Sequence, residues 1–142
     1  MKAEQLRFRG QNIKGQWHSG LVTHDTEKDS DYDWFISNKA GKPYAFGAIE
    51  KTIGQYIGLV DKNCRMLFDG DIVKDRFGRI LRIGIWNYRF CFIAISETNF
   101  YHADFFDWIE RDNRSDDETF PTVEMNVELI GNIHDNPELL TK

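Results

Sequence analysis

The chain has 142 residues, a mass of 16.7 kDa and a net charge of −5, which fits one compact domain and excludes large multi-domain enzymes. Hydrophobic residues make up 41% of it and include 11 Phe, 5 Tyr and 4 Trp, so the core needs no disulfide support. No run of 18 apolar residues and no basic start before an apolar stretch is present. We therefore expect a soluble cytoplasmic protein without a membrane span, in which Cys64 and Cys91 stay free thiols.

Charge is unevenly distributed along the chain. Residues 62–89 carry seven basic and three acidic side chains, whereas residues 103–142 carry three basic and eleven acidic ones. An acidic overall balance argues against a protein whose main task is to wrap nucleic acid, because such proteins present a strongly basic surface. The basic central segment nevertheless keeps nucleic-acid binding open as an alternative.

The first half of the chain predicts short strands joined by polar turns. Apolar alternation and bounding turn residues place these strands at 6–9, 17–23, 32–36, 44–49 and 53–59. The last of them is too rich in glycine for a helix and ends at a turn that begins with Asp61. This half of the chain is therefore expected to be all β.

The centre of the chain predicts a hairpin between the apolar runs 79–86 and 89–95. A two-residue loop of Asn87 and Tyr88 would place Ile83 opposite Phe92, although Tyr88 suits the positive φ of such a turn poorly. The same register places Ile85 opposite Phe90 and Leu81 opposite Ala94. The core is expected to contain the side chains on that face and the apolar face of a later strand: Leu81, Ile83, Ile85, Phe90, Phe92, Val127 and Leu129.

The pattern changes near residue 103. Phe105, Trp108 and Ile109 recur at helical spacing, which predicts a short amphipathic helix over 103–111. A charged loop over 112–121 is expected to follow it, and residues 122–130 alternate in the manner of a half-exposed strand. The sequence Asn-Pro-Glu at 136–138 is typical of a helix start, so a second short helix is expected at the end.

Four segments together resemble the YopX family, whose members are small proteins found mainly in bacteriophages and prophages. They are LRFRG at 6–10 with Trp17 seven positions on, IGQYIGLVDKN at 53–63, LFDGDIV at 67–73 and VELIGNIHDNPELL at 127–140. Between Ile95 and Thr122 the chain departs from the family pattern. The resemblance implies a mainly β fold with a core similar to an SH3-type barrel and a phage protein that acts in a bacterial cell. The family carries no established activity.

Residue patterns and resemblance together predict a mainly β (α+β) fold in a single domain. We expect a small SH3-like β-barrel core with extra N-terminal strands and two short helices. Residues 1–52 would form the strand-rich N-terminal portion, and residues 53–142 the barrel portion with a helical and acidic insert at about 103–121.

Groups that could support catalysis or metal binding are scattered. The four histidines lie in different predicted elements and show no metal-ligand spacing with each other or with the cysteines. His102 with Asp104 and Asp107 could form an acid/base cluster, but Asp104 is more simply a helix cap. Cys91 lies between two phenylalanines, without the electropositive setting of a nucleophile. We expect no catalytic residue, no metal, no cofactor and no enzyme activity.

Two sets of side chains are candidates for contacts with partners. Basic and aromatic residues of the hairpin over 72–93 could contact phosphates and stack on bases, or lie solvated at loop ends: Lys74, Arg76, Phe77, Arg79, Arg82, Trp86, Tyr88 and Arg89. A ring cluster exceeds what one short helix can bury and is the candidate oligomer contact: Phe100, Tyr101, Phe105, Phe106 and Trp108. The acidic segment 104–118 could dock a basic partner or a neighbouring subunit, mimic a phosphate backbone, or form an ordinary solvated loop.

These patterns favour a non-enzymatic phage or prophage accessory protein that acts through protein–protein contacts. Self-association as a homo-oligomer is expected, with a host or phage protein as a further partner and no membrane contact. The alternative is a nucleic-acid-binding SH3-like module that uses the hairpin over 72–93.

Overall fold

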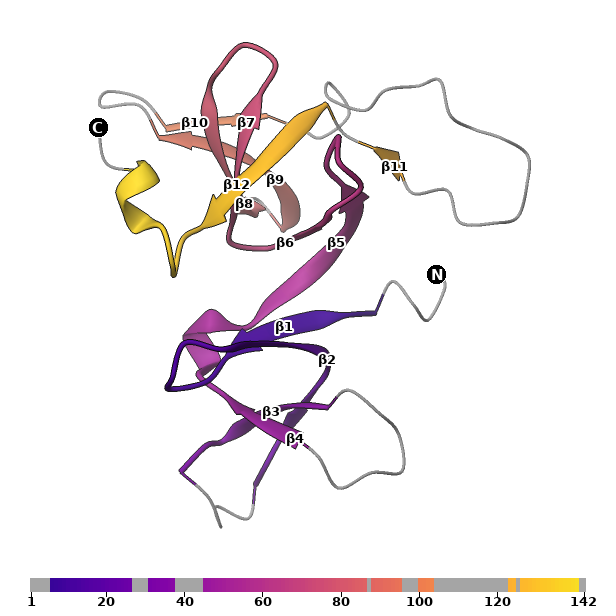
Figure 1. Cartoon of the computed structure of the whole chain (residues 1–142), viewed down its shortest axis with the longest axis vertical. Coiled ribbons are helices and arrows are strands. Elements are labelled where there is room, and N and C mark those ends of the chain that lie inside the picture. The colour runs from indigo at the N-terminus through magenta and orange to yellow at the C-terminus, as the bar shows by residue number, and fades with distance from the viewer. Residues whose placement is uncertain are drawn as a thin grey trace, which may run out of the picture. The chain divides into compact units, whose positions relative to one another are not determined.

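The computed structural model describes residues 6–26, 31–37, 45–86, 88–95, 100–103, 123–124 and 126–140. The chain divides into two compact units, Met1–Tyr56 and Ile57–Lys142. Each unit is described by itself, with the strand labels of Figure 1.

The N-terminal unit is an antiparallel sheet. Its strands are β1 (Phe8–Gln11), β2 (Trp17–His24), β3 (Trp34–Ser37), β4 (Ala45–Ala48) and the first residues of β5 (Gly54–Val60). The order is β5-β1-β2-β3-β4, so the first four strands pair in chain order. One turn of 3-10 helix, η2 (Glu50–Thr52), leads from β4 into β5.

The core of this unit requires a close approach between β1 and β4. Ile36 and Ala48 are buried, and a Cβ atom added at Gly10 would lie only 2.9 Å from the Cβ atom of Ala48. The N–H of Ile49 donates to the carbonyl oxygen of Gln11 at 2.8 Å, which ties the chain after β4 to the end of β1. Glycine at position 10 is therefore needed for packing, because a larger residue would force the two strands apart.

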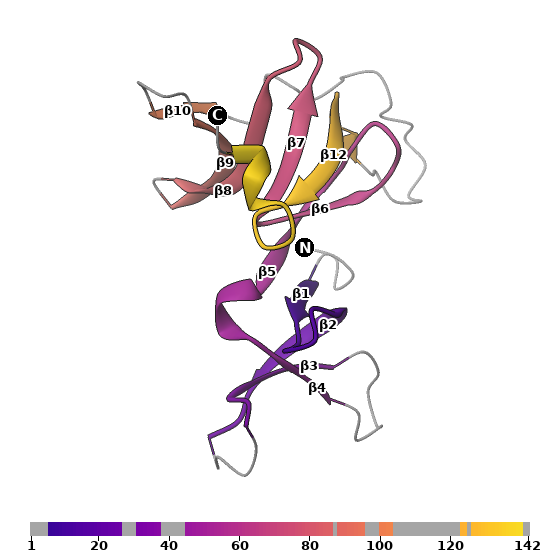
Figure 2. The ribbon, with the colours of Figure 1, turned by 60° about the vertical axis from the view of Figure 1, so that its left-hand side comes forward.

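The C-terminal unit contains a second antiparallel sheet, seen from another side in Figure 2. Its order is β10-β9-β8-β7-β12, while β6 pairs with β5 and β11 lies parallel to β5. The bounds are β6 (Met66–Phe68), β7 (Asp71–Asp75), β8 (Ile80–Trp86), β9 (Arg89–Ile95), β10 (Phe100–Ala103), β11 (Val123–Glu124) and β12 (Val127–Asn132). A 3-10 turn, η4 (Pro137–Leu140), follows β12.

The predicted hairpin register is confirmed. Ile83 pairs with Phe92, and the two-residue turn between β8 and β9 brings Tyr88 to a φ of 66°. The buried core of the unit contains Leu67, Val73, Leu81, Ile83, Phe92 and Val127, with Ile57, Leu59 and Leu129 packed against it. Full burial of such side chains contributes about 1.5–3 kcal/mol each, so this cluster is the main source of stability here.

One predicted core residue is wrong. Ile85 is 59% exposed, although it shares a face with the fully buried Ile83. The pairing of β7 with β8 runs only as far as Arg82, so Ile85 lies on the part of the β8–β9 hairpin that extends past β7, where this neighbouring strand adds nothing to its burial. Phe90, opposite Ile85, is half-buried for the same reason.

The helical predictions also need correction. The expected final helix is a single 3-10 turn, η4, and the helices of the described residues are the two 3-10 turns. The helix expected over 103–111 is wrong at its first residue, because Ala103 is the last residue of strand β10. Residues 104–111 lie outside the described residues. The strand expected over 122–130 is divided into β11 and β12. The part of the chain that the structure describes is mainly β and shows no closed barrel.

Candidate functional site

Two hairpins of the C-terminal unit have the same five-residue loop. Residues 61–65 join β5 to β6 and residues 75–79 join β7 to β8. In both, the N–H of the first residue donates to the carbonyl oxygen of the fifth, and the N–H of the fourth donates to the carbonyl oxygen of the first. The fourth residue has a positive φ, 60° at Cys64 and 81° at Gly78. The first and fifth residues are the bonded pair that closes the hairpin, so residues 62–64 and 76–78 are three-residue hairpin loops in which a turn is followed by a left-handed residue.

A buried aspartate anchors each loop. One carboxylate oxygen of Asp61 accepts the N–H groups of Asn63 at 2.9 Å and Arg65 at 2.8 Å, and the other accepts Nε of Arg65 at 2.9 Å. Asp75 makes the same three bonds at 2.9, 2.9 and 2.7 Å. Both aspartate side chains are 0% exposed, and the paired arginines are half-exposed. The carboxylate therefore satisfies the donors of the loop and fixes its shape.

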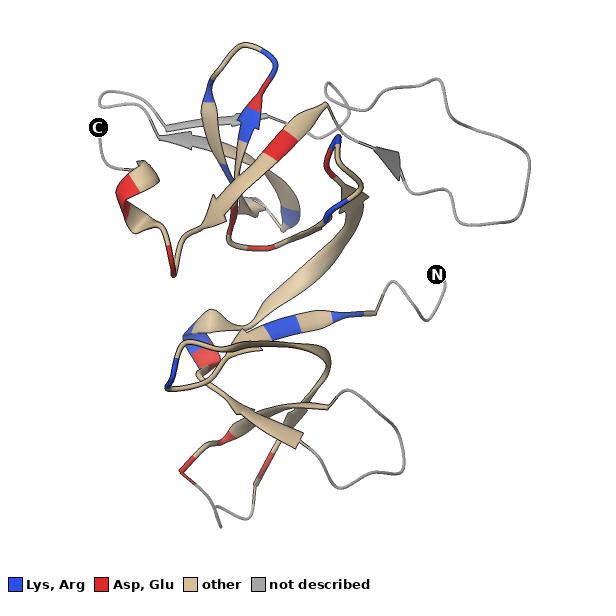
Figure 3. Ribbon diagram, viewed as in Figure 1, with Lys and Arg blue, Asp and Glu red and all other residues tan. Residues whose placement is uncertain are grey.

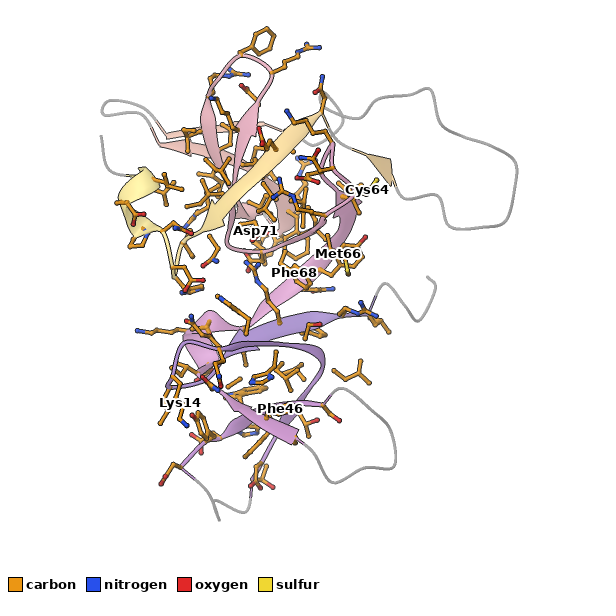
Figure 4. The ribbon with its side chains drawn as sticks, in the orientation of Figure 1. Lys14, Phe46, Cys64, Met66, Phe68 and Asp71 are labelled. Carbon is orange, nitrogen blue, oxygen red and sulfur yellow. The ribbon has the colours of Figure 1, made fainter. Side chains whose placement is uncertain are left out.

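The loop recurs in the N-terminal unit with a neutral pair, Asn12 and Gln16, in place of the aspartate and arginine. Residues 12–16 join β1 to β2, and Oδ1 of Asn12 accepts the N–H groups of Lys14 and Gln16, each at 2.9 Å. Gly15 has a φ of 79° and takes the place of Cys64, and Nδ2 of Asn12 donates to Oε1 of Gln16 at 3.0 Å. Figure 4 labels Lys14 and Cys64 in the two loops. The signal of this repeat in the sequence is Asp or Asn four positions before Arg or Gln, and it is absent from the predictions above.

The β5–β6 loop also holds strand β12. The carboxylate of Asp61 accepts the N–H of Leu129 at 3.0 Å, and Nη2 of Arg65 donates to the carbonyl oxygen of Leu129 at 2.9 Å. The N–H of Lys62 donates to the carbonyl oxygen of Val127, and its ammonium lies 3.4 Å from the carboxylate of Glu128. These contacts satisfy the edge of β12 that is not paired with β7.

Asp61 is held in its charged form. Burial alone would raise its pKa, but the N–H groups of Leu129, Arg65 and Asn63, together with the Arg65 side chain, lower the pKa below its ordinary value. A carboxylate with four donors is thus more stable in the folded protein than in water, so Asp61 contributes stability at neutral pH.

The β7–β8 loop instead presents its side chains to solvent. Phe77 is 66% exposed, and the guanidinium carbons of Arg76 and Arg79 lie 4.7 and 5.3 Å from the centre of its ring. Lys74 is exposed and near the loop, because a Cβ atom at Gly78 would lie 3.9 Å from its Cε atom. Figure 3 shows Lys and Arg on both sides of this loop. Three sequence-predicted residues, Arg76, Phe77 and Arg79, thus come together at this loop, and a fourth, Lys74, lies beside it.

The other residues of the predicted hairpin site lie elsewhere. Tyr88 and Arg89 are exposed at the opposite end of β8, a strand of seven residues and therefore about 20 Å long. Arg82 is half-buried between Ile72 and Ile93, and its Nε atom has no hydrogen-bond partner among the described residues. The side chain of Trp86 lies outside the described residues. The predicted set is therefore divided between two ends of the sheet.

The remaining predicted groups form no further cluster in the part of the chain that is described. Phe100 and Tyr101 belong to β10, but their side chains and residues 105, 106 and 108 lie outside the described residues. Of the histidines, His18 stacks on Phe46 with 4.0 Å between the ring centres, and the ring centres of His24 and Trp34 are 4.5 Å apart. Within the described ranges, no group of three His, Cys, Asp or Glu side chains could hold a metal.

Comparison with known proteins gives a single assignment. In the described part of the chain, no helix is long and apolar enough to cross a membrane. No curated protein matches the chain. The family described as YopX protein matches residues 5–141, nearly the whole sequence. The chain therefore belongs to the YopX family.

Proposed function

We propose that this YopX protein is a non-enzymatic accessory protein of a bacteriophage or prophage. It acts through protein–protein contacts in the bacterial cytoplasm, and it forms a homo-oligomer. The observation that carries the proposal is the exposure of apolar side chains at the β8–β9 end, where Ile85 is 59% and Tyr88 101% exposed. Exposed apolar groups at one place on a protein favour a contact site, and tyrosine is enriched among residues that dominate binding energy.

The backbone of Tyr88 gives this end further support. A left-handed conformation costs a residue with a side chain about 1–2 kcal/mol, and glycine or asparagine would fit the turn better. A tyrosine kept in that conformation, with its ring fully exposed, gains nothing from packing within its own unit. A contact with another chain would explain why the ring is there.

Light scattering during size-exclusion chromatography tests the proposal. Wild type at tens of micromolar is expected to elute with the mass of a dimer or larger assembly, and the double variant Ile85→Ser, Tyr88→Ser as a monomer. Ile13→Ser is the matched control, because Ile13 is 76% exposed in a loop of the other unit. A monomeric wild type, or an assembly that survives the double substitution, would contradict this site.

The second candidate function is nucleic-acid binding by an SH3-like module. The observation that favours it is the β7–β8 loop, where Arg76 and Arg79 lie against the exposed ring of Phe77 and Lys74 lies beside Gly78. The SH3-like arrangement is supported by the five-stranded sheet and by the bonds from Asp61 and Arg65 to β12. A pull-down from infected cells with and without nuclease separates the two functions, because nuclease removes partners that are held only through nucleic acid.

A further inference from the structure

The β7–β8 loop carries positive charge that its own scaffold leaves uncompensated. Its one carboxylate, Asp75, is buried and bonded to Arg79. Among the described residues Arg76 makes no hydrogen bond or ion pair, and its guanidinium lies over the ring of Phe77. Lys74 adds a third cation, and Glu128, which lies opposite it on β12, is already paired with Lys62. When that pair is counted as neutral, the three cations and Asp75 leave a local charge of about +2.

The β5–β6 loop shows that the scaffold itself does not require such charge. There the second position is Lys62, which pairs with Glu128, and the fifth is Arg65, which bonds to Asp61 and to the carbonyl oxygen of Leu129. The equivalent second position of the β7–β8 loop, Arg76, has no acid beside it in the described residues. The difference lies in the surroundings and not in the loop fold.

The geometry of the β7–β8 loop suits the binding of a phosphate group better than the stacking of a nucleobase. The ring of Phe77 already lies against two guanidinium groups, so it offers its faces to arginine. A guanidinium placed over a ring keeps its plane oriented and its N–H donors at the edge, which fits the two oxygens of a phosphate. The buried Asp75 holds the backbone of the loop, so the donors are arranged before a ligand arrives.

We propose that the β7–β8 loop binds the phosphodiester backbone of nucleic acid without reading its sequence. Lys74, Arg76 and Arg79 contact phosphates, and Phe77 acts as a positioning residue for Arg76. This inference rests on the second candidate function above and narrows it to one end of the sheet. Tyr88 and Arg89 take no part, because they lie about 20 Å away at the other end of β8.

The size of the loop favours nucleic acid over an acidic protein. A stable protein–protein interface buries about 800 Å² on each partner, which needs many more residues than one hairpin end. Individual Arg and Lys side chains, in contrast, bind phosphates singly and still position a protein on a duplex. An acidic protein partner is therefore the competing outcome for the experiment.

Fluorescence anisotropy with the full chain and a labelled duplex DNA of random sequence tests the proposal over a series of salt concentrations. Three phosphate contacts predict that log K falls against log salt with a slope of about −2.7. Arg76→Gln should reduce the steepness by about 0.9 and weaken binding about eightfold at 0.1 M salt. Phe77→Ala should weaken binding while the slope stays that of wild type, because the charge of Arg76 remains.

Lys14→Gln is the control, since it removes one positive charge from an exposed position of the equivalent loop in the N-terminal unit and should leave binding unchanged. Equal effects of Arg76→Gln and Lys14→Gln, or a larger loss in Arg89→Gln, would overturn the assignment to this loop. No binding by wild type at low salt would remove the nucleic-acid function as a whole. If poly-glutamate binds as tightly as DNA, the proposal of a nucleic-acid ligand is wrong and an acidic protein is the partner. Thermal melting of each variant shows that the fold is retained.

Discussion

The β5–β6 and β7–β8 loops share one backbone and differ in what they face. Both are anchored by a buried aspartate and an arginine four residues later. Strand β12 lies against the first loop and uses its carboxylate, its guanidinium and one backbone N–H. The second loop has no such strand among the described residues, and its cations surround an exposed ring. A local scaffold thus sets shape, while its neighbours decide whether it supports the fold or presents a surface.

The largest expected effect is the loss of the anchor of the first loop. Asp61→Ala leaves the buried N–H groups and the Arg65 side chain without their acceptor, and it also releases Leu129 in β12. Removing one partner of a buried ion pair costs about 3–5 kcal/mol. Asp75→Ala should cost less, because it breaks the loop without detaching a strand. Urea unfolding measures both, and equal losses would show that the bond to β12 contributes nothing.

Acid should weaken the first anchor less than truncation does, because a protonated Asp61 keeps its shape and one acceptor oxygen. The pKa of Asp61 is lowered in the folded protein. Its contribution is therefore complete above the unfolded pKa of about 3.9 and is lost as the pH falls through the lower folded pKa. Asp61→Asn removes this dependence.

The measurement is the free energy of unfolding of wild type and Asp61→Asn between about pH 6 and about pH 3. The difference between them should shrink toward the acid end, because only wild type loses the carboxylate. Other carboxylates titrate in both proteins and cancel in that comparison. A constant or growing difference would contradict the assigned direction of the pKa shift.

Substitutions at the fourth loop position should change stability by smaller amounts and in opposite directions. Cys64 is strained by its left-handed conformation, whereas Gly78 adopts the same conformation without strain. Cys64→Gly should stabilise the protein by up to about 1 kcal/mol, since relief of about 1–2 kcal/mol of strain is offset in part by the greater freedom of unfolded glycine. Gly78→Ala should destabilise it by about 1 kcal/mol, because the nearest atom to an added Cβ is 3.9 Å away and only the backbone resists. Thermal melting of both variants checks the signs.

The hairpin of β8 and β9 shows what sequence reasoning could predict. A two-residue loop and strict alternation determine which residues face each other, and Ile83 opposite Phe92 is confirmed. The exposure of Ile85 could not be found in that way, because it depends on where β7 ends and not on the hairpin itself. Alternation predicts a face, whereas burial also needs a neighbouring strand or layer.

The candidate site was predictable only in part. The basic residues near position 76 could be recognised from composition, but their separation from Tyr88 follows from the length and direction of β8. The repeat of the loop was hidden because Cys64 occupies the position where Gly15 and Gly78 mark the other copies. β10 was missed since its four residues pair with β9 without a clear apolar alternation. The separation of the cations from Tyr88 and the presence of β10 depend on tertiary pairing, whereas the loop repeat had a signal in the sequence itself.

The smallest expected effects concern the second loop position, and they separate the two loops most directly. Lys62 and Glu128 form an ion pair with side chains 48% and 43% exposed, so Lys62→Gln should cost only about 0.2–1 kcal/mol, and less at high salt. Arg76→Gln should change stability by no more than about 0.5 kcal/mol, because this exposed cation has no acid to lose among the described residues.

A double-mutant cycle of Lys62→Gln with Glu128→Gln isolates the pair from other effects of each substitution. A coupling energy should appear at low salt and vanish at high salt. Arg76→Gln combined with Glu128→Gln is the control and should be additive. Coupling between Arg76 and Glu128 would mean that the cation of the second loop also serves the fold. In that case the contrast between a loop that closes a sheet and a loop that presents charge would not hold.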